Sequence, residues 1–143
     1  MGFNALEAYA DARGVDFSVV AAAQGSDYES GIARIDGAEW HVRTARNTPT
    51  KPGAFLAFWQ RAEDGSTMPF GHDALGAGLL VFVEQQGGRG VFRFTAAHLA
   101  ELGVVSGPRP GKRGFRVYPA WCTGLNPQAA ATQHAQAAAF EVY

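Results

Sequence analysis

The sequence has few of the residues that define several large classes of protein. A single cysteine, Cys122, among 143 residues excludes an internal disulfide framework and a zinc site built from cysteines. The apolar stretches of the chain are short, and none approaches the ~20 residues that span a bilayer. The first residues include acids but no basic start followed by an apolar run, so we expect no secretory signal. These absences predict a cytoplasmic protein without a membrane segment.

Charged residues are also scarce, at 17%, whereas hydrophobic residues reach 47%. A folded protein ordinarily has ~25% charged residues, so this chain has more than enough apolar surface to form a core. The length of 143 residues suits one domain, and no linker or internal repeat interrupts the chain. We therefore predict a single domain over residues 1–143.

The charges that are present are segregated along the chain. The net charge of −1 and the pI of about 6.4 exclude a globally basic nucleic-acid binder. Two long segments, residues 40–62 and 102–140, nevertheless contain basic residues and no acid. Together they hold Arg43, Arg46, Lys51, Arg61, Arg109, Lys112, Arg113 and Arg116. This distribution predicts a locally basic surface on a nearly neutral protein.

Spacing and capping signals predict three helices, over residues 3–13, 95–102 and 126–137. Asn4, Thr95 and Asn126 are their candidate N-caps, and Gly14 suits the position just past the first helix. The apolar run from 17 to 23 fits either an extension of the helical region or a separate element. Gly25-Ser26-Asp27 then breaks the pattern.

The remaining apolar runs predict a sheet. Strands are expected over residues 32–35, 40–44, 55–60, 79–84, 91–94 and 115–118, with an edge strand within 138–143. Asp36-Gly37 predicts a tight hairpin turn. The run from 55 to 60 is apolar on both faces, so we expect a central strand there. Residues 47–53, 65–78 and 106–114 are expected as loops. The fold class predicted is α/β (α+β), with a mixed, mostly antiparallel central sheet flanked by helices.

The basic segments carry the candidate binding residues. In the first, strand alternation places Arg43 away from the face of Trp40 and Val42, while Arg46 and Lys51 lie at the strand end and in a proline-stiffened loop. The second segment, residues 111–121, interleaves cations with aromatic residues: Lys112, Arg113, Phe115, Arg116, Tyr118 and Trp121. Cations neutralise phosphates and aromatic rings stack on bases, which predicts a nucleic-acid interface. The alternative is that Phe115 belongs to the core and the cations are ordinary surface charges.

The acids offer a third candidate site. Asp73 precedes a buried strand that ends at Glu84, and Glu29 lies just before the first hairpin. Carboxylates at the ends of adjacent strands could bind Mg²⁺ and activate water against a phosphodiester. The alternative is that these acids are simply solvated. No paired-histidine zinc motif, P-loop or G-x-S-x-G motif occurs in the sequence.

At these same segments the chain resembles the MepB family. The matching pieces are Tyr28-Glu29, residues 46–53 (RNTPTKPG), residues 55–59 (FLAFW), residues 69–73, Arg116-Val-Tyr-Pro119 with Trp121, and the tail from 132 to 140. Members are encoded in bacteria. The resemblance implies a restriction-endonuclease-like, PD-(D/E)xK-type fold and nucleic-acid binding.

An active nuclease of that fold needs an Asp followed by an acid-x-Lys on a neighbouring strand. Asp73 suits the first role, but Glu84-Gln85-Gln86 offers acid-x-Gln. Lys51 could supply the missing ammonium, with Glu29 as an additional acid. The candidate catalytic residues are thus Asp73, Glu84 and Lys51, and the candidate Mg²⁺ ligands are Glu29, Asp73 and Glu84.

Two functions from different classes follow. The first is a protein that binds DNA or RNA phosphates through its basic loops, and that is either inactive or a weak Mg²⁺-dependent nuclease. The second is a non-catalytic module on the same fold that binds another protein. An exposed apolar patch containing Phe115 and Trp121 would favour the second, and a positive cleft lined by Arg43, Lys51 and Lys112 would favour the first.

Overall fold

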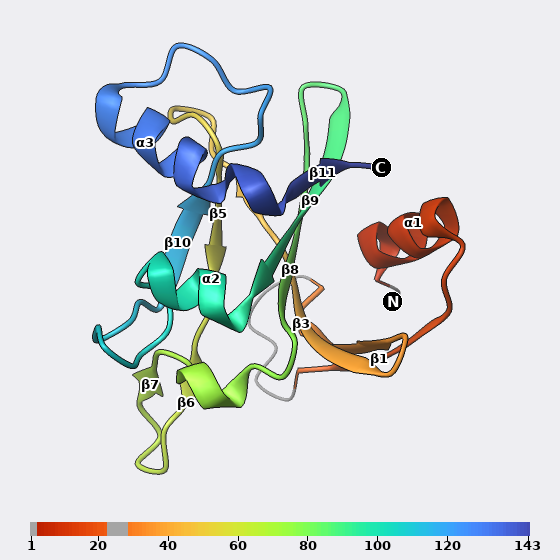
Figure 1. Ribbon diagram of the computed structural model, residues 1–143, viewed down its shortest axis with the longest axis vertical. Coiled ribbons are helices and arrows are strands. Elements are labelled where there is room, and N and C mark those ends of the chain that lie inside the picture. The colour runs from red at the N-terminus through yellow and green to blue at the C-terminus, as the bar shows by residue number, and fades with distance from the viewer. Residues whose placement is uncertain (1–2, 23–28) are drawn as a thin grey trace.

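The computed structural model describes residues 3–22 and 29–143 and contains two main sheets (Figure 1). The larger has six strands in the order β1-β2-β3-β8-β9-β11, and the smaller has three in the order β10-β5-β4. The larger sheet is formed by β1 (Phe17–Ala21), β2 (Gly31–Ile35), β3 (Ala38–Thr44), β8 (Gly78–Gln85), β9 (Gly88–Thr95) and β11 (Phe140–Val142). The smaller consists of β4 (Arg46–Asn47), β5 (Ala54–Ala57) and β10 (Gly114–Val117). Strands β6 (Gln60–Arg61) and β7 (Thr67–Met68) form a separate two-stranded ribbon.

The predicted fold class is confirmed. The pair β3–β8 is parallel, and every other strand pair among the described residues is antiparallel. Helices α1 (Asn4–Arg13), α2 (Ala96–Glu101) and α3 (Pro127–Gln136) flank the sheets, with short 3₁₀ turns η1 (His72–Ala74) and η2 (Ala137–Ala139). The chain is therefore a single domain with a mixed, mostly antiparallel central sheet. No helix among the described residues is long and apolar enough to cross a membrane.

The core lies on both faces of the larger sheet because alternate residues of β8 point in opposite directions. Leu79, Val81 and Val83 pack toward the smaller sheet and α2, whereas Leu80 and Phe82 pack toward α1. Figure 1 shows α1 on one side of the larger sheet, and α2, α3, β5 and β10 on the other. The smaller sheet thus has one face against the core.

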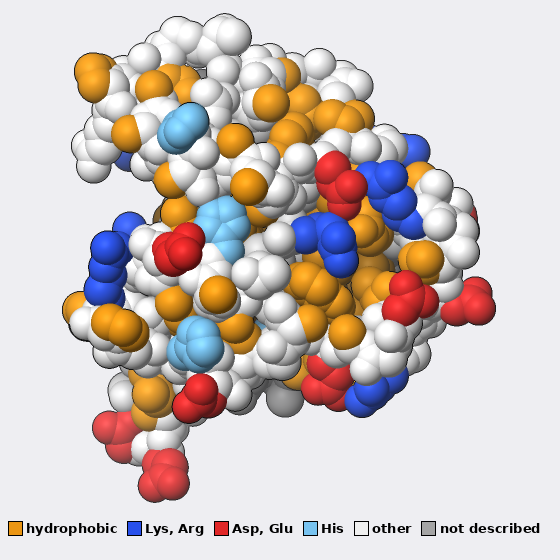
Figure 2. All heavy atoms as spheres, in the orientation of Figure 1, with side chains coloured by type: hydrophobic (Ala, Val, Ile, Leu, Met, Phe, Trp, Pro, Cys, Tyr) orange, Lys and Arg blue, Asp and Glu red, His pale blue; other side chains and the backbone are white. Residues whose placement is uncertain are grey.

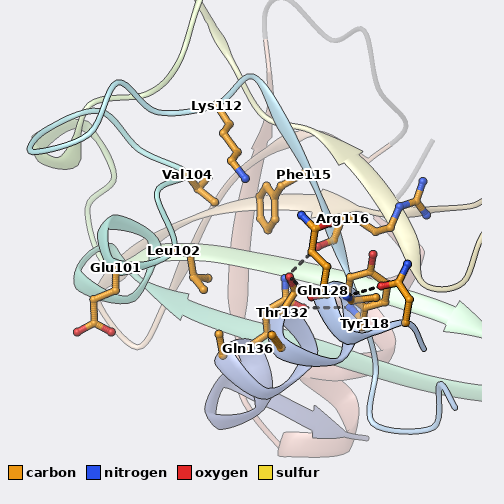
Figure 3. A pocket seen from close by; sticks show the side chains of 14 residues that line it. Glu101, Leu102, Val104, Lys112, Phe115, Arg116, Tyr118, Gln128, Thr132 and Gln136 are labelled. Carbon is orange, nitrogen blue, oxygen red and sulfur yellow. Dashed lines mark hydrogen bonds between the residues drawn. The ribbon is translucent and has the colours of Figure 1, made fainter. Parts of the chain in front are cut away.

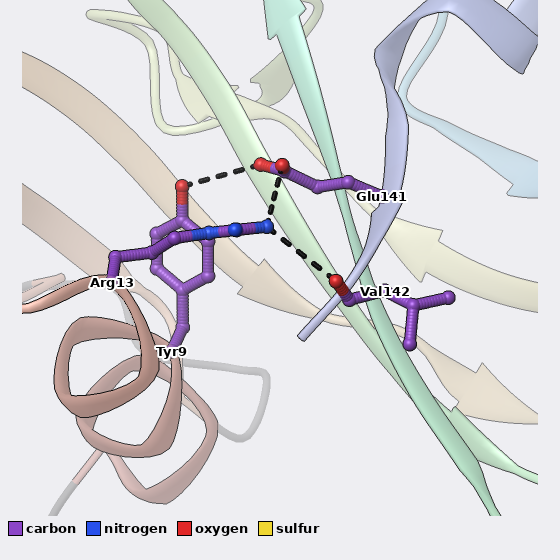
Figure 4. A network of polar contacts seen from close by, with 4 residues as sticks. All are labelled: Tyr9, Arg13, Glu141 and Val142. Atoms are coloured by element: carbon purple, nitrogen blue, oxygen red, sulfur yellow. Dashed lines mark hydrogen bonds and ion pairs between the residues drawn. The ribbon is translucent and has the colours of Figure 1, made fainter.

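Helix α1 is attached to the C-terminal strand by contacts distant in sequence (Figure 4). Arg13 donates to Glu141 Oε2 at 2.6 Å and to the Val142 carbonyl at 3.5 Å, while the Tyr9 hydroxyl lies 3.4 Å from Glu141 Oε1. The ion pair is partly exposed, so it contributes at most about 1 kcal/mol. Packing of Tyr9 edge-on against Phe82 supplies the apolar part of the contact.

Several local predictions hold. Thr95 and Asn126 cap α2 and α3 through their side chains, and Gly14 adopts the left-handed conformation after α1. The hairpin turn at Asp36-Gly37 has positive φ at both residues, 51° and 80°. The edge strand expected near the C-terminus is β11.

Other predictions about local structure are wrong. Phe3 rather than Asn4 is the N-cap of α1, without a side-chain cap. Residues 17–21 form strand β1 and do not extend the helix. The strand expected over 55–60 ends at Ala57 and belongs to the smaller sheet. Short strands and a 3₁₀ turn lie in the segments expected as loops. The predicted break at 25–27 and Tyr28 fall outside the described residues.

His41 gives the fold a testable pH dependence. Its ring is 8% exposed, lies edge-on to Phe58 and Phe70, and has Nε2 3.3 Å from the Ala74 carbonyl. Burial lowers the pKa of His41 below its ordinary value of 6.5. The hydrogen bond with the Ala74 carbonyl offsets part of this effect, and the charge of Arg43 adds to it. The unfolded chain therefore binds a proton at this residue more readily than the folded chain does.

Stability is consequently expected to fall as the pH drops through 6.5, until the folded histidine also becomes protonated. One histidine changes the free energy of unfolding by at most about 1.4 kcal/mol per pH unit. Urea unfolding measured from pH 8 to pH 5 should show this slope in the native protein and in the control His134→Gln, whose residue is exposed. His41→Gln should flatten it, and an unchanged slope in that variant would refute the assignment.

Candidate nucleic-acid interface

The smaller sheet is assembled from the two acid-free segments of the chain. Strands β4 and β5 lie within residues 40–62, and β10 lies within residues 102–140. The pairing of β5 with β10 therefore joins segments that are far apart in sequence but alike in charge. The segregation seen along the sequence becomes a segregation in space at this sheet.

Arg46, Phe55 and Arg116 form a row across the three strands. Phe55 is the direct partner of Arg46 on β4 and of Arg116 on β10, and directly paired residues place their side chains on the same face. The next residues along the two strands, Leu56 after Phe55 and Val117 after Arg116, are buried in the core. The row therefore points away from the core, and the side chain of Phe55 is 41% exposed. We call this row, with Lys51 in the loop between β4 and β5, the basic sheet face.

The guanidinium of Arg116 is held in place by that loop. It donates to Thr48 Oγ1 at 2.8 Å and to the Pro52 carbonyl at 3.1 Å, and Cζ lies 6.0 Å from the centre of the Phe55 ring. These contacts connect the second basic segment directly to the proline-containing loop of the first. The structure thus brings together Arg46, Lys51 and Arg116, which the sequence had placed in two separate candidate segments.

Gln85, which sequence reasoning did not identify, connects the same loop to the larger sheet. Its Nε2 donates to Asn47 Oδ1 at 2.9 Å and to the Gly53 carbonyl at 3.3 Å. Its Oε1 accepts from Trp121 Nε1 at 3.0 Å and lies 3.4 Å from Cys122 Sγ. Gln85 follows Glu84 at the end of β8 and occupies the unspecified position of the acid-x-Gln triplet, so no pattern in the sequence singles it out. Trp121 and Gln85 therefore position the loop.

The other predicted cations lie elsewhere. Arg43 is 7% exposed, donates to the Val42 carbonyl and has Cζ 5.2 Å from the centre of the Phe58 ring, which encloses its charge within the fold. Arg113 donates to the carbonyl and hydroxyl of Thr67, both at 3.1 Å. Lys51 and Lys112 lie beyond opposite ends of the β5–β10 pair. Arg43, Lys51 and Lys112 therefore do not line one continuous cleft.

Lys112 borders a pocket between α3, β10 and the end of α2. The pocket has a volume of about 570 Å³ and mixes apolar walls with polar groups of α3. Figure 2 shows the hollow at the left edge below α3, and Figure 3 shows Lys112 at one end with Tyr118 and Gln128 at the other. Gln136, at the base of α3, accepts from the Tyr118 N–H and donates to the Arg116 carbonyl. Lys112 and Tyr118 line this pocket together with Arg116, so the pocket adjoins the basic sheet face at Arg116.

The aromatic residues of the second segment do not form an exposed patch. Phe115 is 7% exposed, and Trp121 packs edge-on against Phe140. The feature that would have favoured a protein-binding module is therefore not formed by these two side chains. Protein binding stays a prediction.

The candidate acids are distributed over two ends of β8. Asp73 lies in η1, whose Ala74 carbonyl contacts His41, the strand partner of Leu79 near the start of β8. Glu84 is five residues beyond Leu79, so the two ends are about 16 Å apart along the strand. Two oxygens bound to one Mg²⁺ lie within about 4 Å of each other. Asp73 and Glu84 therefore do not fit a single shared Mg²⁺ ion.

Glu29 is used within the fold. Its side chain is buried, and its carboxylate accepts from the Asn4 N–H at 2.9 Å and from Thr44 Oγ1 at 2.8 Å. A carboxylate at the first turn of α1 also interacts favourably with the helix dipole. Over residues 3–22 and 29–143, no group of three or more His, Cys, Asp or Glu side chains is arranged to hold a metal ion.

Comparison with known proteins agrees with the resemblance seen in the sequence. Among solved structures, the chain is similar to one described as the crystal structure of MepB, with 28% identity and a TM-score of 0.86; the match covers 99% of this chain and 97% of that one. The two proteins therefore share one α+β fold. A model of the MepB-like family matches residues 22–142, and the chain belongs to that family. The comparison with curated proteins finds no match.

Proposed function

We propose that the protein binds nucleic acid through the basic sheet face. The observation that carries the proposal is the row Arg46–Phe55–Arg116 on the outward face of a sheet built from two acid-free segments. Arginine side chains bind phosphate oxygens, and the release of counterions from the phosphates drives the association. A nearly neutral protein can bind a polyanion in this way because its positive charges are gathered on one surface.

The proposed activity is binding without cleavage. Asp73 and Glu84 lie at opposite ends of β8, and both oxygens of Glu29 accept hydrogen bonds within the fold. These carboxylates thus give no common centre beside the basic sheet face from which water could be activated. A labelled strand incubated with the protein and Mg²⁺ is expected to keep its full length, and Mg²⁺-dependent shortening would contradict the proposal.

Binding is expected to depend steeply on salt. If Arg46, Lys51 and Arg116 each neutralise one phosphate, affinity should fall about 20- to 40-fold between about 50 and about 200 mM salt. Fluorescence anisotropy with labelled single- and double-stranded DNA and RNA measures this slope.

Arg46→Ala combined with Lys51→Ala should remove about two-thirds of the slope and weaken binding at least about tenfold at low salt. Arg34→Ala combined with Arg93→Ala removes the same charge from exposed positions on the larger sheet, and should leave most of the affinity intact. Equal losses in the two double variants would show that net charge, and not this face, controls binding.

A further inference from the structure

Phe55 puts an aromatic ring on the basic sheet face, although binding phosphates alone requires only cations. It is a large apolar side chain, 41% exposed, in the middle strand of the smaller sheet and between two arginines. Its ring leans over Gly114, where an added Cβ would lie 2.7 Å from Phe55 Cζ. The absence of a side chain at Gly114 therefore gives the ring room to lie along the sheet.

The arginines on either side of the ring suit the two phosphates that flank one base. Arg46 and Arg116 are two strands apart, about 10 Å across the sheet. Thr48 and Pro52 hold the Arg116 guanidinium beside the ring before any ligand arrives. Preorganised donors lose less freedom on binding than mobile ones, so this arrangement favours a ligand with a phosphate on each side of a flat group.

We infer that the basic sheet face binds single-stranded nucleic acid, with one unpaired base stacked on Phe55 and its neighbouring phosphates bound by Arg46 and Arg116. The inference rests on the proposed function and narrows its substrate class. A duplex offers phosphates to the arginines, but its bases are already stacked and paired. Only a single strand can bury the exposed ring and bind the arginines at once, because an unpaired base is free to turn toward the sheet.

The test compares a labelled thymidine 12-mer with the duplex of the same length, at one salt concentration. The single strand is expected to bind at least about tenfold more tightly. Phe55→Leu keeps the apolar bulk but removes the aromatic face, and should weaken single-strand binding about 5- to 100-fold. Phe55→Trp keeps an aromatic face and should retain single-strand affinity.

Circular dichroism and urea unfolding confirm that each variant is folded. Equal affinity for single strand and duplex, or an unchanged affinity in Phe55→Leu, would overturn the inference while leaving the proposed function intact. Absence of salt-dependent binding to every nucleic acid would instead overturn the proposed function. A uracil 12-mer run in parallel shows whether the single strand preferred is DNA or RNA.

Discussion

Replacement of Gly53 by alanine is expected to lower the free energy of unfolding by about 2–5 kcal/mol, because backbone strain and a steric clash add together. Gly53 has a φ of +77°, and a Cβ there would lie 2.5 Å from the Val117 carbonyl oxygen and 2.8 Å from the Tyr118 ring. Relief of these contacts requires β5 and β10 to separate where Ala54 pairs with Val117. Affinity for nucleic acid should therefore fall with stability, since the row of Arg46, Phe55 and Arg116 depends on that pairing.

Gly87 provides a matched control for this substitution. Its φ of +76° is nearly the same, but no atom lies within 4 Å of the position that a Cβ would occupy. Gly87→Ala should therefore carry only the backbone cost, about 1–2 kcal/mol, and retain binding. Urea unfolding and anisotropy on both variants separate the two effects. Equal losses of stability would mean that contact between Gly53 and β10 does not matter.

Replacement of Gln136 by leucine is expected to lower the free energy of unfolding by about 1–3 kcal/mol, because two partly buried backbone groups lose their hydrogen-bond partner. Gln136 is 2% exposed. Its amide accepts from the Tyr118 N–H at 3.0 Å and donates to the Arg116 carbonyl at 2.9 Å. These two hydrogen bonds replace those that a neighbouring strand would form along the unpaired edge of β10.

The loss should also move β10 and so weaken binding at Arg116. Gln128→Leu, at an exposed position of the same helix, makes the same chemical change and should alter stability by less than about 0.5 kcal/mol. Hydrogen exchange at Arg116, Val117 and Tyr118 reports the edge directly, and faster exchange is expected only in Gln136→Leu. Unchanged exchange in that variant would contradict the proposed role of the amide.

Much of the fold could be predicted because the deciding signals are local. Thr95 and Asn126 cap helices through hydrogen bonds to backbone groups three residues away, and Asp36-Gly37 closes its hairpin within the turn itself. The placement of β5 was not predictable in the same way. Residues 55–59 are uniformly apolar, and only the pairing with β10, about 60 residues later, shows that Phe55 faces outward.

The candidate site could be predicted only in part, because it too depends on pairing between distant segments. The acid-free segments are visible in the sequence, and the structure joins them. Burial, which the sequence does not show, decides which cations face outward. Arg43 does lie on the face of β3 opposite Trp40, as predicted, but that face is also buried, because it packs against Phe58. The distance between Asp73 and Glu84 follows from the length of β8 and required the strand boundaries. The restriction-endonuclease-like classification of the fold stays a prediction.

Photocrosslinking tests most directly whether the basic sheet face is the interface. A single-stranded oligonucleotide carrying 5-iodouracil is bound to the native protein, irradiated and digested, and the modified peptides are sequenced by mass spectrometry. The crosslinks are expected at Phe55 and its neighbours, within residues 46–57 and 114–118. Crosslinks confined to another surface, such as β1 and β2, with none on these strands, would contradict the assignment of the interface.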